Sequence, residues 1–369
     1  MSRATRQRGF SLVELMVAVV LALLTVLVVM QVLSIYDARR RTTTAGNDAE
    51  ISAAVGLFLV ERDVRMAGAG LTLPSGFACN LGINIYFDGD VVSDAAMLMP
   101  VLITDGGAGP DTIQVSRSDS PFGVAPATIV KSMPTPSSIL TVNSSAGLVE
   151  QDLFLVGAPD GNKICTLMQM TQDAQATGNG WNLNHNPGTS DFNPPNPANV
   201  FTEAIRYDIG DVVVNLGRFG LRSFTVICDD DGVPATDNRC SLVGFDPLAA
   251  PDPLTLADAD ALAAEVVDFQ AQYGVAPAGS QDVDEWVDAT GATWADPAPA
   301  DIARIKAVRM VIVTRGNREP VMVSPEQLVL WDAGEPTELV RDLSDEERRY
   351  RYKVLTVVVP LINVIWAGV

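Results

Sequence analysis

Histidine is almost absent from this chain, which has only His185 among its 369 residues. A single imidazole excludes metal sites with two histidine ligands, and it permits a Ser-His-Asp triad only with His185 as the base. Residues 181–188 around it are rich in Asn, Pro and Gly, which is typical of a surface loop. A glycine-rich phosphate loop followed by lysine is also missing. We therefore expect a protein that is not an enzyme.

Basic residues are the second shortage. The chain has 25 Lys and Arg against 45 Asp and Glu, which gives a formal charge of -20. Such a surface repels phosphate backbones, so we expect no nucleic acid as a partner. Hydrophobic residues make up 47% of the chain, enough for a sizeable core.

Proline and glycine are missing from one long apolar run, residues 10–33. Its length suits a helix that crosses a hydrocarbon core of ~30 Å. A cleaved secretory signal would have a shorter apolar region of ~7–15 residues and a small-residue cleavage site, and neither is found. The arginines before the run favour a cytoplasmic N-terminus, whereas the arginines at 39–41 oppose it, so charge alone leaves the orientation open.

Glu14 is the exception within this run. A carboxylate here costs ~2.5–3.5 kcal/mol on insertion, so it marks a function that involves a partner. If the chain were cut between Gly9 and Phe10, the new α-amino group of one subunit would be able to pair with Glu14 of a neighbour. That pair would neutralise two costly groups and set the axial register of packed helices.

Residues 8–15 read Arg-Gly-Phe-Ser-Leu-Val-Glu-Leu. They resemble, at every position, the prepilin processing motif of type IV pilins and type II secretion pseudopilins. The resemblance implies cleavage after Gly9 by a prepilin peptidase, N-methylation of Phe10 and an assembly role for Glu14. Major pilins often have a proline near the position of Gln31, and its absence here favours a minor subunit.

The chain has four cysteines and no CxxC pair. With an export-type N-terminus, they indicate two disulfides in an oxidising compartment. The favoured pairing is Cys228 with Cys240, because so short a loop costs little entropy to close. Cys79 would then pair with Cys165. Buried free thiols are the alternative.

The segment between Cys228 and Cys240 is acidic. Asp229, Asp231 and Asp237 would offer oxygen ligands near a glycine turn, as Ca²⁺ requires. The spacing is not that of an EF-hand, so an acidic surface loop closed by a disulfide is the preferred interpretation and calcium the alternative. No other cofactor is expected.

Helical character continues beyond the membrane. Apolar residues recur at helical spacing (Ile51, Val55, Phe58 and Leu59), which predicts that this stripe packs on a globular domain. Glycines at 68 and 70 end the helix. Four segments result: a leader at 1–9, a transmembrane and assembly helix at 10–33, its amphipathic continuation at 34–67 and a β-rich globular domain at 68–369.

Short β-prone runs fill much of the domain and predict an antiparallel sheet (112–115, 139–142, 153–156, 204–207 and 221–226). A helix is predicted at about 260–269. The continuous apolar character of 308–313 and 354–361 predicts two central strands buried on both faces. These elements give an α+β fold, pilin-like, with the long helix laid against the sheet.

Three segments near the C-terminus, 265–275, 307–313 and 351–363, are similar to the C-terminal half of PilW-type minor pilins, while residues 72–200 are unmatched. The resemblance implies a structural minor pilin that helps to initiate type IV pilus assembly in the tip or priming complex. The implied partners are other minor and major pilins, the prepilin peptidase, the inner membrane and a tip adhesin. The expected location is the inner membrane, with a single pass and a periplasmic domain, and then the pilus tip. The alternatives are a type II secretion minor pseudopilin and a membrane-tethered adhesin or ligand-binding module.

Overall fold

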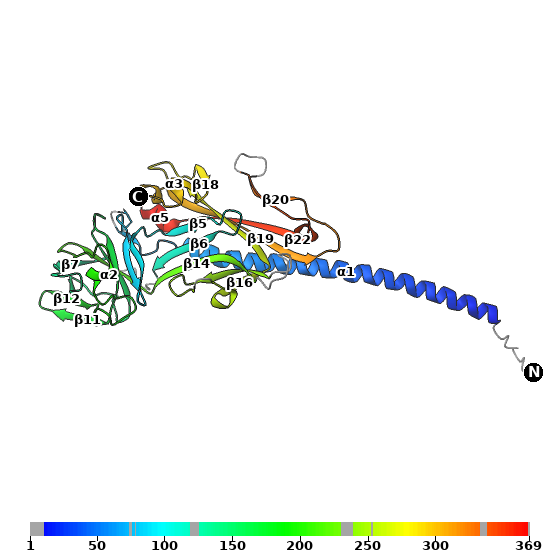
Figure 1. Ribbon diagram of the computed structural model, residues 1–369, viewed down its shortest axis with the longest axis horizontal. Coiled ribbons are helices and arrows are strands. Elements are labelled where there is room, and N and C mark those ends of the chain that lie inside the picture. The colour runs from blue at the N-terminus through cyan, green and yellow to red at the C-terminus, as the bar shows by residue number, and fades with distance from the viewer. Residues whose placement is uncertain are drawn as a thin grey trace, which may run out of the picture.

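One long helix dominates the shape of the molecule. In the computed structural model, which describes residues 11–73, 76–77, 79–118, 125–229, 239–251, 254–332 and 338–367, α1 spans Leu12–Arg65 and projects from a β-rich domain (Figure 1). Its first part, Leu12–Ser34, is long and apolar enough to cross a membrane and is not buried against the domain. The second part lies along the domain.

The described strands form three main sheets. The largest has nine strands, in the order β11 (Gln172–Thr177), β12 (Gly180–Asn184), β8 (Leu140–Val142), β7 (Ala127–Lys131), β13 (Val212–Gly217), β9 (Leu153–Gly157), β10 (Cys165–Gln169), β3 (Ile83–Phe87) and β4 (Asp90–Ala96). It builds the lobe farthest from the start of α1, where β7, β11 and β12 are labelled in Figure 1.

The other two main sheets lie beside the second part of α1. One has the order β16 (Asp260–Ala264), β15 (Cys240–Phe245), β14 (Phe219–Cys228), β6 (Thr112–Ser118) and β5 (Val101–Thr104). The other has the order β18 (Glu285–Val287), β17 (Val266–Val275), β19 (Ile305–Arg318) and β22 (Tyr350–Pro360). The pairings are antiparallel apart from that of β10 with β3, so the predicted α+β class is confirmed.

The remaining elements are small. Two-stranded ribbons are formed by β1 (Thr72–Leu73) with β2 (Gly76–Phe77) and by β20 (Gln327–Trp331) with β21 (Leu339–Asp342). The short helices are α2 (Pro197–Val200), α3 (Gly291–Trp294), α4 (Pro299–Ile302), α5 (Ile362–Ala367), η1 (Leu256–Asp258) and η2 (Glu347–Arg349).

The domain-facing side of α1 differs from the predicted one. Its buried apolar side chains are those of Ala53, Leu57, Val60 and Val64, at the spacing of one helical face, and α1 contacts β16, β19 and β22. Gly56 permits this contact, because a Cβ there would lie 2.7 Å from the Cβ of Ala263 on β16. The predicted stripe was therefore wrong: Ile51, Val55 and Phe58 face away from the domain and are 63%, 51% and 61% exposed.

A buried carboxylate also joins α1 to the five-stranded sheet. Asp63 is only 3% exposed, and its carboxylate lies 3.9 Å from Arg117 of β6 and 3.9 Å from Arg222 of β14. Arg62 lies 3.4 Å from the same group. A buried charge requires such partners, so Asp63 helps to fix how the sheet meets the helix.

The predicted helix at 260–269 is wrong, since these residues form β16 and the start of β17. Glu265 separates the two strands with a φ of 58°. Val266 and Phe269 then pair with Thr314 and Ile312 of β19. Cross-strand packing of β-branched and aromatic side chains outweighs the local helical signal here. The predicted strand at 204–207 is also absent, because its Tyr207 turns inward and donates to the Ile164 carbonyl (2.9 Å).

The two predicted central strands have different outcomes. Residues 308–313 lie in β19, are buried and have a partner strand on each side, as predicted. The segment 354–361 belongs mostly to β22, which is the last strand of its sheet, and Val358 is 51% exposed. Apolar composition alone does not distinguish a central strand from an edge strand.

Asp111 joins the start of β6 to β17 and should make stability depend on pH. Its carboxylate accepts hydrogen bonds from the Gly106 amide (2.9 Å) and the Ala271 amide (2.7 Å). Burial raises the pKa of Asp111 to about 7, against the two hydrogen bonds, which lower it. Nearby Asp105 and Asp268 raise the pKa further.

Because the pKa of Asp111 is higher in the folded than in the unfolded chain, its stabilising contribution is complete below pH ~3.9 and is lost as the pH rises towards 7. At ~1.36 kcal/mol per pKa unit, the free energy of unfolding should fall by up to about 4 kcal/mol over this range. The measurement is urea unfolding of the full chain in detergent at pH 4.5 and pH 8. In Asp111→Asn, the difference in the free energy of unfolding between the two pH values should become small. An unchanged difference in this variant would contradict the assignment.

Candidate assembly site

Of the predicted processing and assembly residues, the structure describes Glu14, at the start of α1. Glu14 lies in the first turn, is exposed, and accepts a hydrogen bond from the Ser11 amide at 3.3 Å. A carboxylate is favourable there, because the amides of a helix N-terminus carry partial positive charge. Gly9 and Phe10 lie outside the described residues, so cleavage and N-methylation at this point remain predictions.

From Glu14 onwards, α1 presents apolar side chains on every side. No part of the chain that the structure describes covers the span Leu12–Ser34. Its polar groups bond within the helix: the Thr25 hydroxyl donates to the Leu21 carbonyl at 2.8 Å, and the Ser34 hydroxyl to the Gln31 carbonyl at 2.9 Å. The span is therefore suited to lipid and to the helices of other subunits.

The apolar surface returns beyond the membrane. Ile51, Val55 and Phe58 follow one another at intervals of four and three residues, on the side of α1 that faces away from the domain. With a rise of ~1.5 Å per residue, this stripe begins roughly 25 Å beyond Ser34 and ends roughly 36 Å beyond it. We call these three residues the outer stripe. Exposed apolar residues arranged along one helix face are typical of a surface that is covered in an assembly.

Both predicted disulfides are present. Cys79 bonds to Cys165 at the start of β10 with a Cα–Cα distance of 5.5 Å, and Cys228 of β14 bonds to Cys240 of β15 with 3.9 Å. The first joins the turn before β3 to β10 of the nine-stranded sheet, across 86 residues of sequence. The second closes the hairpin between β14 and β15.

The predicted calcium ligands are only partly described. The amide of Asp229 donates to the Arg239 carbonyl at 2.9 Å, which continues the hairpin for one more pair. Asp231 and Asp237 lie outside the described residues. In the part of the chain that the structure describes, no group of three or more His, Cys, Asp or Glu side chains is arranged to hold a metal ion. Calcium binding therefore remains a prediction.

His185 is buried, which corrects the surface-loop prediction. Its ring meets Phe154 edge to face, with centroids 6.3 Å apart, and neither ring nitrogen has a hydrogen-bond partner among the described residues. Burial lowers the pKa of His185 to about 4, partly offset by the Leu183 backbone, so the ring is neutral at pH 7. The segment with Pro194 and Pro197 folds back over it, since these two residues and Pro187 line the same small cavity.

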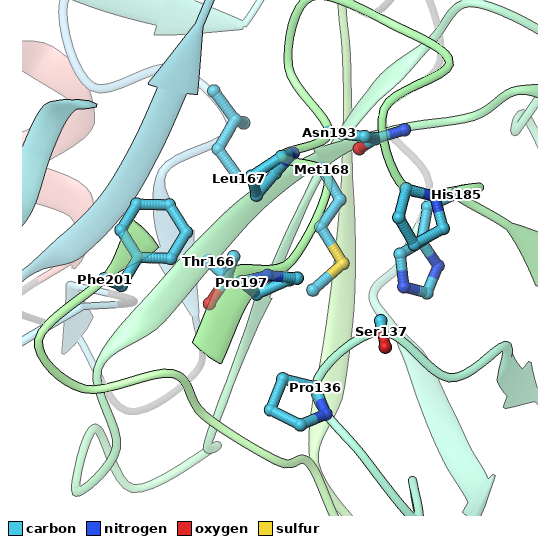
Figure 2. A pocket seen from close by; sticks show the side chains of 11 residues that line it. Pro136, Ser137, Thr166, Leu167, Met168, His185, Asn193, Pro197 and Phe201 are labelled. Atoms are coloured by element: carbon cyan, nitrogen blue, oxygen red, sulfur yellow. The ribbon is translucent and has the colours of Figure 1, made fainter. Parts of the chain in front are cut away.

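This cavity has a volume of about 20 Å³, which is room for one water molecule. Figure 2 shows Met168 and Ser137 close to the His185 ring, with Phe201 on the far side. No carboxylate is among the residues that line it, so nothing in the cavity would orient the ring as the base of a triad. The cavity supports a structural role for His185.

Comparisons with known proteins agree with this geometry. Residues 249–363 match the family model described as Type IV pilus-assembly protein W, and residues 4–30 match the prokaryotic N-terminal methylation motif. The resemblance of the C-terminal segments to PilW-type pilins and that of the N-terminus to a prepilin motif are thereby confirmed. The first match includes the whole four-stranded sheet, and the second includes Glu14. No curated protein and no solved structure matches the chain.

Proposed function

We propose that this chain is a minor pilin that helps to initiate type IV pilus assembly in the tip or priming complex. The observation that carries the proposal is the apolar surface of α1, which is continuous over Leu12–Ser34 and resumes at the outer stripe. One face of the helix is already buried on the domain. The outer stripe is left for a helix of another subunit, as in a pilin-like arrangement.

The proposed mechanism uses the N-terminus of each subunit. Prepilin peptidase would cut after Gly9, and Phe10 would become the N-methylated first residue. In the uncut chain, Glu14 bonds to the Ser11 amide of its own helix at 3.3 Å. On assembly, the carboxylate would exchange this weak intrahelical bond for the Phe10 amine of a neighbour, which neutralises both charges in lipid.

The size of the domain supports a position at the tip. The nine-stranded lobe adds a second large body beyond the sheets that contact α1 (Figure 1). A subunit of this bulk would crowd its neighbours inside a continuous filament, whereas a tip or priming complex leaves space beyond the lobe. The proposed path is a single pass in the inner membrane with the domain in the periplasm, and then the pilus tip.

The partners that fit this role are other minor and major pilins, the prepilin peptidase and a tip adhesin. A type II secretion minor pseudopilin would share the N-terminal motif, but the match of residues 249–363 to a type IV pilus-assembly family favours the pilus. This match also favours a structural role over that of a tethered adhesin.

Changing Phe58 to lysine tests the outer stripe. The side chain is exposed, so the free energy of unfolding should change by no more than ~0.5 kcal/mol. If the ring is an aromatic anchor between subunits, its loss should cost ~2 kcal/mol of association, or roughly 30-fold weaker binding. Surface pili, counted by electron microscopy, should become rare.

Leu57→Ala is the matched control on the adjacent, domain-facing position. Leu57 is buried, so this variant should lose ~2–5 kcal/mol of stability through the cavity it creates. Normal piliation by a stable Phe58→Lys protein would defeat the proposed role of the stripe.

A further inference from the structure

The outer edge of β22 has hydrogen-bonding groups that no neighbour among the described residues uses. β22 ends the four-stranded sheet, with β19 on one side. The Leu361 amide donates to the Lys306 carbonyl at 2.8 Å, and in an antiparallel ladder every second residue bonds to the same partner strand. The backbone groups of Val354, Thr356 and Val358 therefore point away from β19. No described strand or loop pairs with them.

This edge also lacks the usual protection. Residues 354–359 read Val-Leu-Thr-Val-Val-Val, without charge, glycine or proline, between Lys353 and Pro360. Exposed edge strands are normally blocked by charged side chains, prolines or bulges, because an open edge recruits other strands. A six-residue run with five β-branched residues is also an aggregation hazard. A partner strand in the assembly would remove both problems.

The membrane-proximal end of the same edge is already closed. The amides of Val323 and Ser324 donate to the Arg348 carbonyl, at 2.8 and 3.0 Å. The Ser324 hydroxyl donates to the Tyr350 carbonyl at 2.6 Å. The chain thus covers the approach to β22 with its own loop and stops before residue 354, which defines the open segment.

The direction of β22 limits the partner. Lys353 lies 3.4 Å from Glu50 of α1, and the Asn363 amide donates to the Ala67 carbonyl at 3.0 Å. Because Glu50 precedes Ala67 on a helix that leads away from the membrane span, β22 also runs away from the membrane. An antiparallel partner strand must run towards it.

A second copy of this chain does not fit as an antiparallel partner. Antiparallel pairing of β22 with its own copy would relate the two chains by a twofold axis across the strands, and their α1 helices would then point in opposite directions. Two such helices do not enter one membrane from the same side. The opposite edge of the sheet, β18, has only three residues, Glu285–Val287, too few to cover six.

We propose that residues 354–359 of β22 receive an extended, membrane-directed strand from a different subunit anchored in the same membrane, which adds a fifth strand to this sheet. Backbone hydrogen bonds supply the contact, and alternate side chains of the partner pack beside Val358 and Val354. Only one part of the inference rests on the proposed function, namely that the partner is anchored in the same membrane.

Thr356→Pro and Thr356→Ala form a matched pair for the test. Proline removes an amide that points outwards, so the bonds to β19 remain and an edge strand tolerates it. Alanine keeps the amide. With the full chain produced in pilus-forming cells, Thr356→Pro should reduce co-purification of the partner by about tenfold or more, whereas Thr356→Ala should not. Val357→Pro is the control for folding. It removes an amide that bonds to β19, so it should unfold the sheet.

A photo-crosslinker at Val358 identifies the partner. The crosslinked peptide should come from a strand of another protein with a prepilin-type N-terminus. Hydrogen exchange of residues 354–359 should slow by about tenfold or more in the purified complex relative to the isolated subunit, which tests the contact even if Thr356→Pro misfolds.

The inference would be overturned if the Thr356→Pro and Thr356→Ala variants retained the partner equally or lost it equally. It would also be overturned by a crosslink from Val358 to a second copy of this chain, or by hydrogen exchange of residues 354–359 that is unchanged in the complex. These outcomes are separate from a failure of the proposed helix mechanism. That failure would be seen as normal piliation with Glu14→Ala, and it leaves the contrast between the two Thr356 variants intact.

Discussion

Replacing Glu14 with alanine should abolish surface pili while the N-terminus is still processed. The change removes the carboxylate that would pair with the Phe10 amine of a neighbouring subunit. It also removes a group that costs ~2.5–3.5 kcal/mol in the apolar span, so the variant should enter the membrane at least as well as the native chain. Loss of pili would then not reflect poor insertion.

The measurement combines electron microscopy of surface pili with mass spectrometry of the mature N-terminus. Gln31→Ala is the control, because it removes a polar side chain from the same exposed span without touching the proposed pair. Normal piliation with Glu14→Ala would refute the register mechanism. Failure of both variants would point to a general requirement for polar groups in the span rather than to Glu14.

The second large effect concerns the disulfides, whose loss should not be equivalent. Cys79 and Cys165 are 86 residues apart in sequence, whereas Cys228 and Cys240 are 12 apart. Loop-closure entropy predicts that removal of the first costs about 4.5 kcal/mol and removal of the second about 3 kcal/mol. The longer link also lies in the core of the nine-stranded sheet, since Cys165 is fully buried.

The comparison uses two double variants, Cys79→Ala/Cys165→Ala and Cys228→Ala/Cys240→Ala, of the full chain in detergent. Urea unfolding should give a lower midpoint for the first than for the second. Equal midpoints would show that the long link does not act by restricting the unfolded chain.

Features that depend on neighbouring residues were predictable from the sequence. The part of α1 that is long and apolar enough to cross a membrane follows from a single apolar run, and the end of the helix follows from the glycines after residue 65. The spacing of Gly9, Phe10 and Glu14 led to the pilin resemblance, which the two family matches support. In each case the signal lies within one segment, so no distant contact is needed to read it.

The face of α1 that packs on the domain could not be predicted from the sequence. Ile51, Val55 and Phe58 and the set Ala53, Leu57, Val60 and Val64 both have helical spacing, and the larger side chains suggested the wrong face. The domain takes the second set, because Ala53 and Gly56 allow β16 to approach closely. Steric fit to a sheet distant in sequence made the choice.

Distant pairing likewise decided the strands. Residues 260–269 become β-structure because β19 lies beside them, and 354–359 lie at an edge because no described strand follows β22 in the sheet order. The burial of His185 results from the segment with Pro194 and Pro197, which folds over it.

The sequence by itself therefore determined that this chain has one long apolar helix with a carboxylate near its start and a processing motif, because each is encoded locally. The four cysteines and the short β-prone runs also indicated a disulfide-bonded β-rich domain. Only the tertiary structure decided which surfaces remain open: the outer stripe on α1 and the free edge of β22. Exposure is the outcome of competition among all segments for burial, and no single segment contains it.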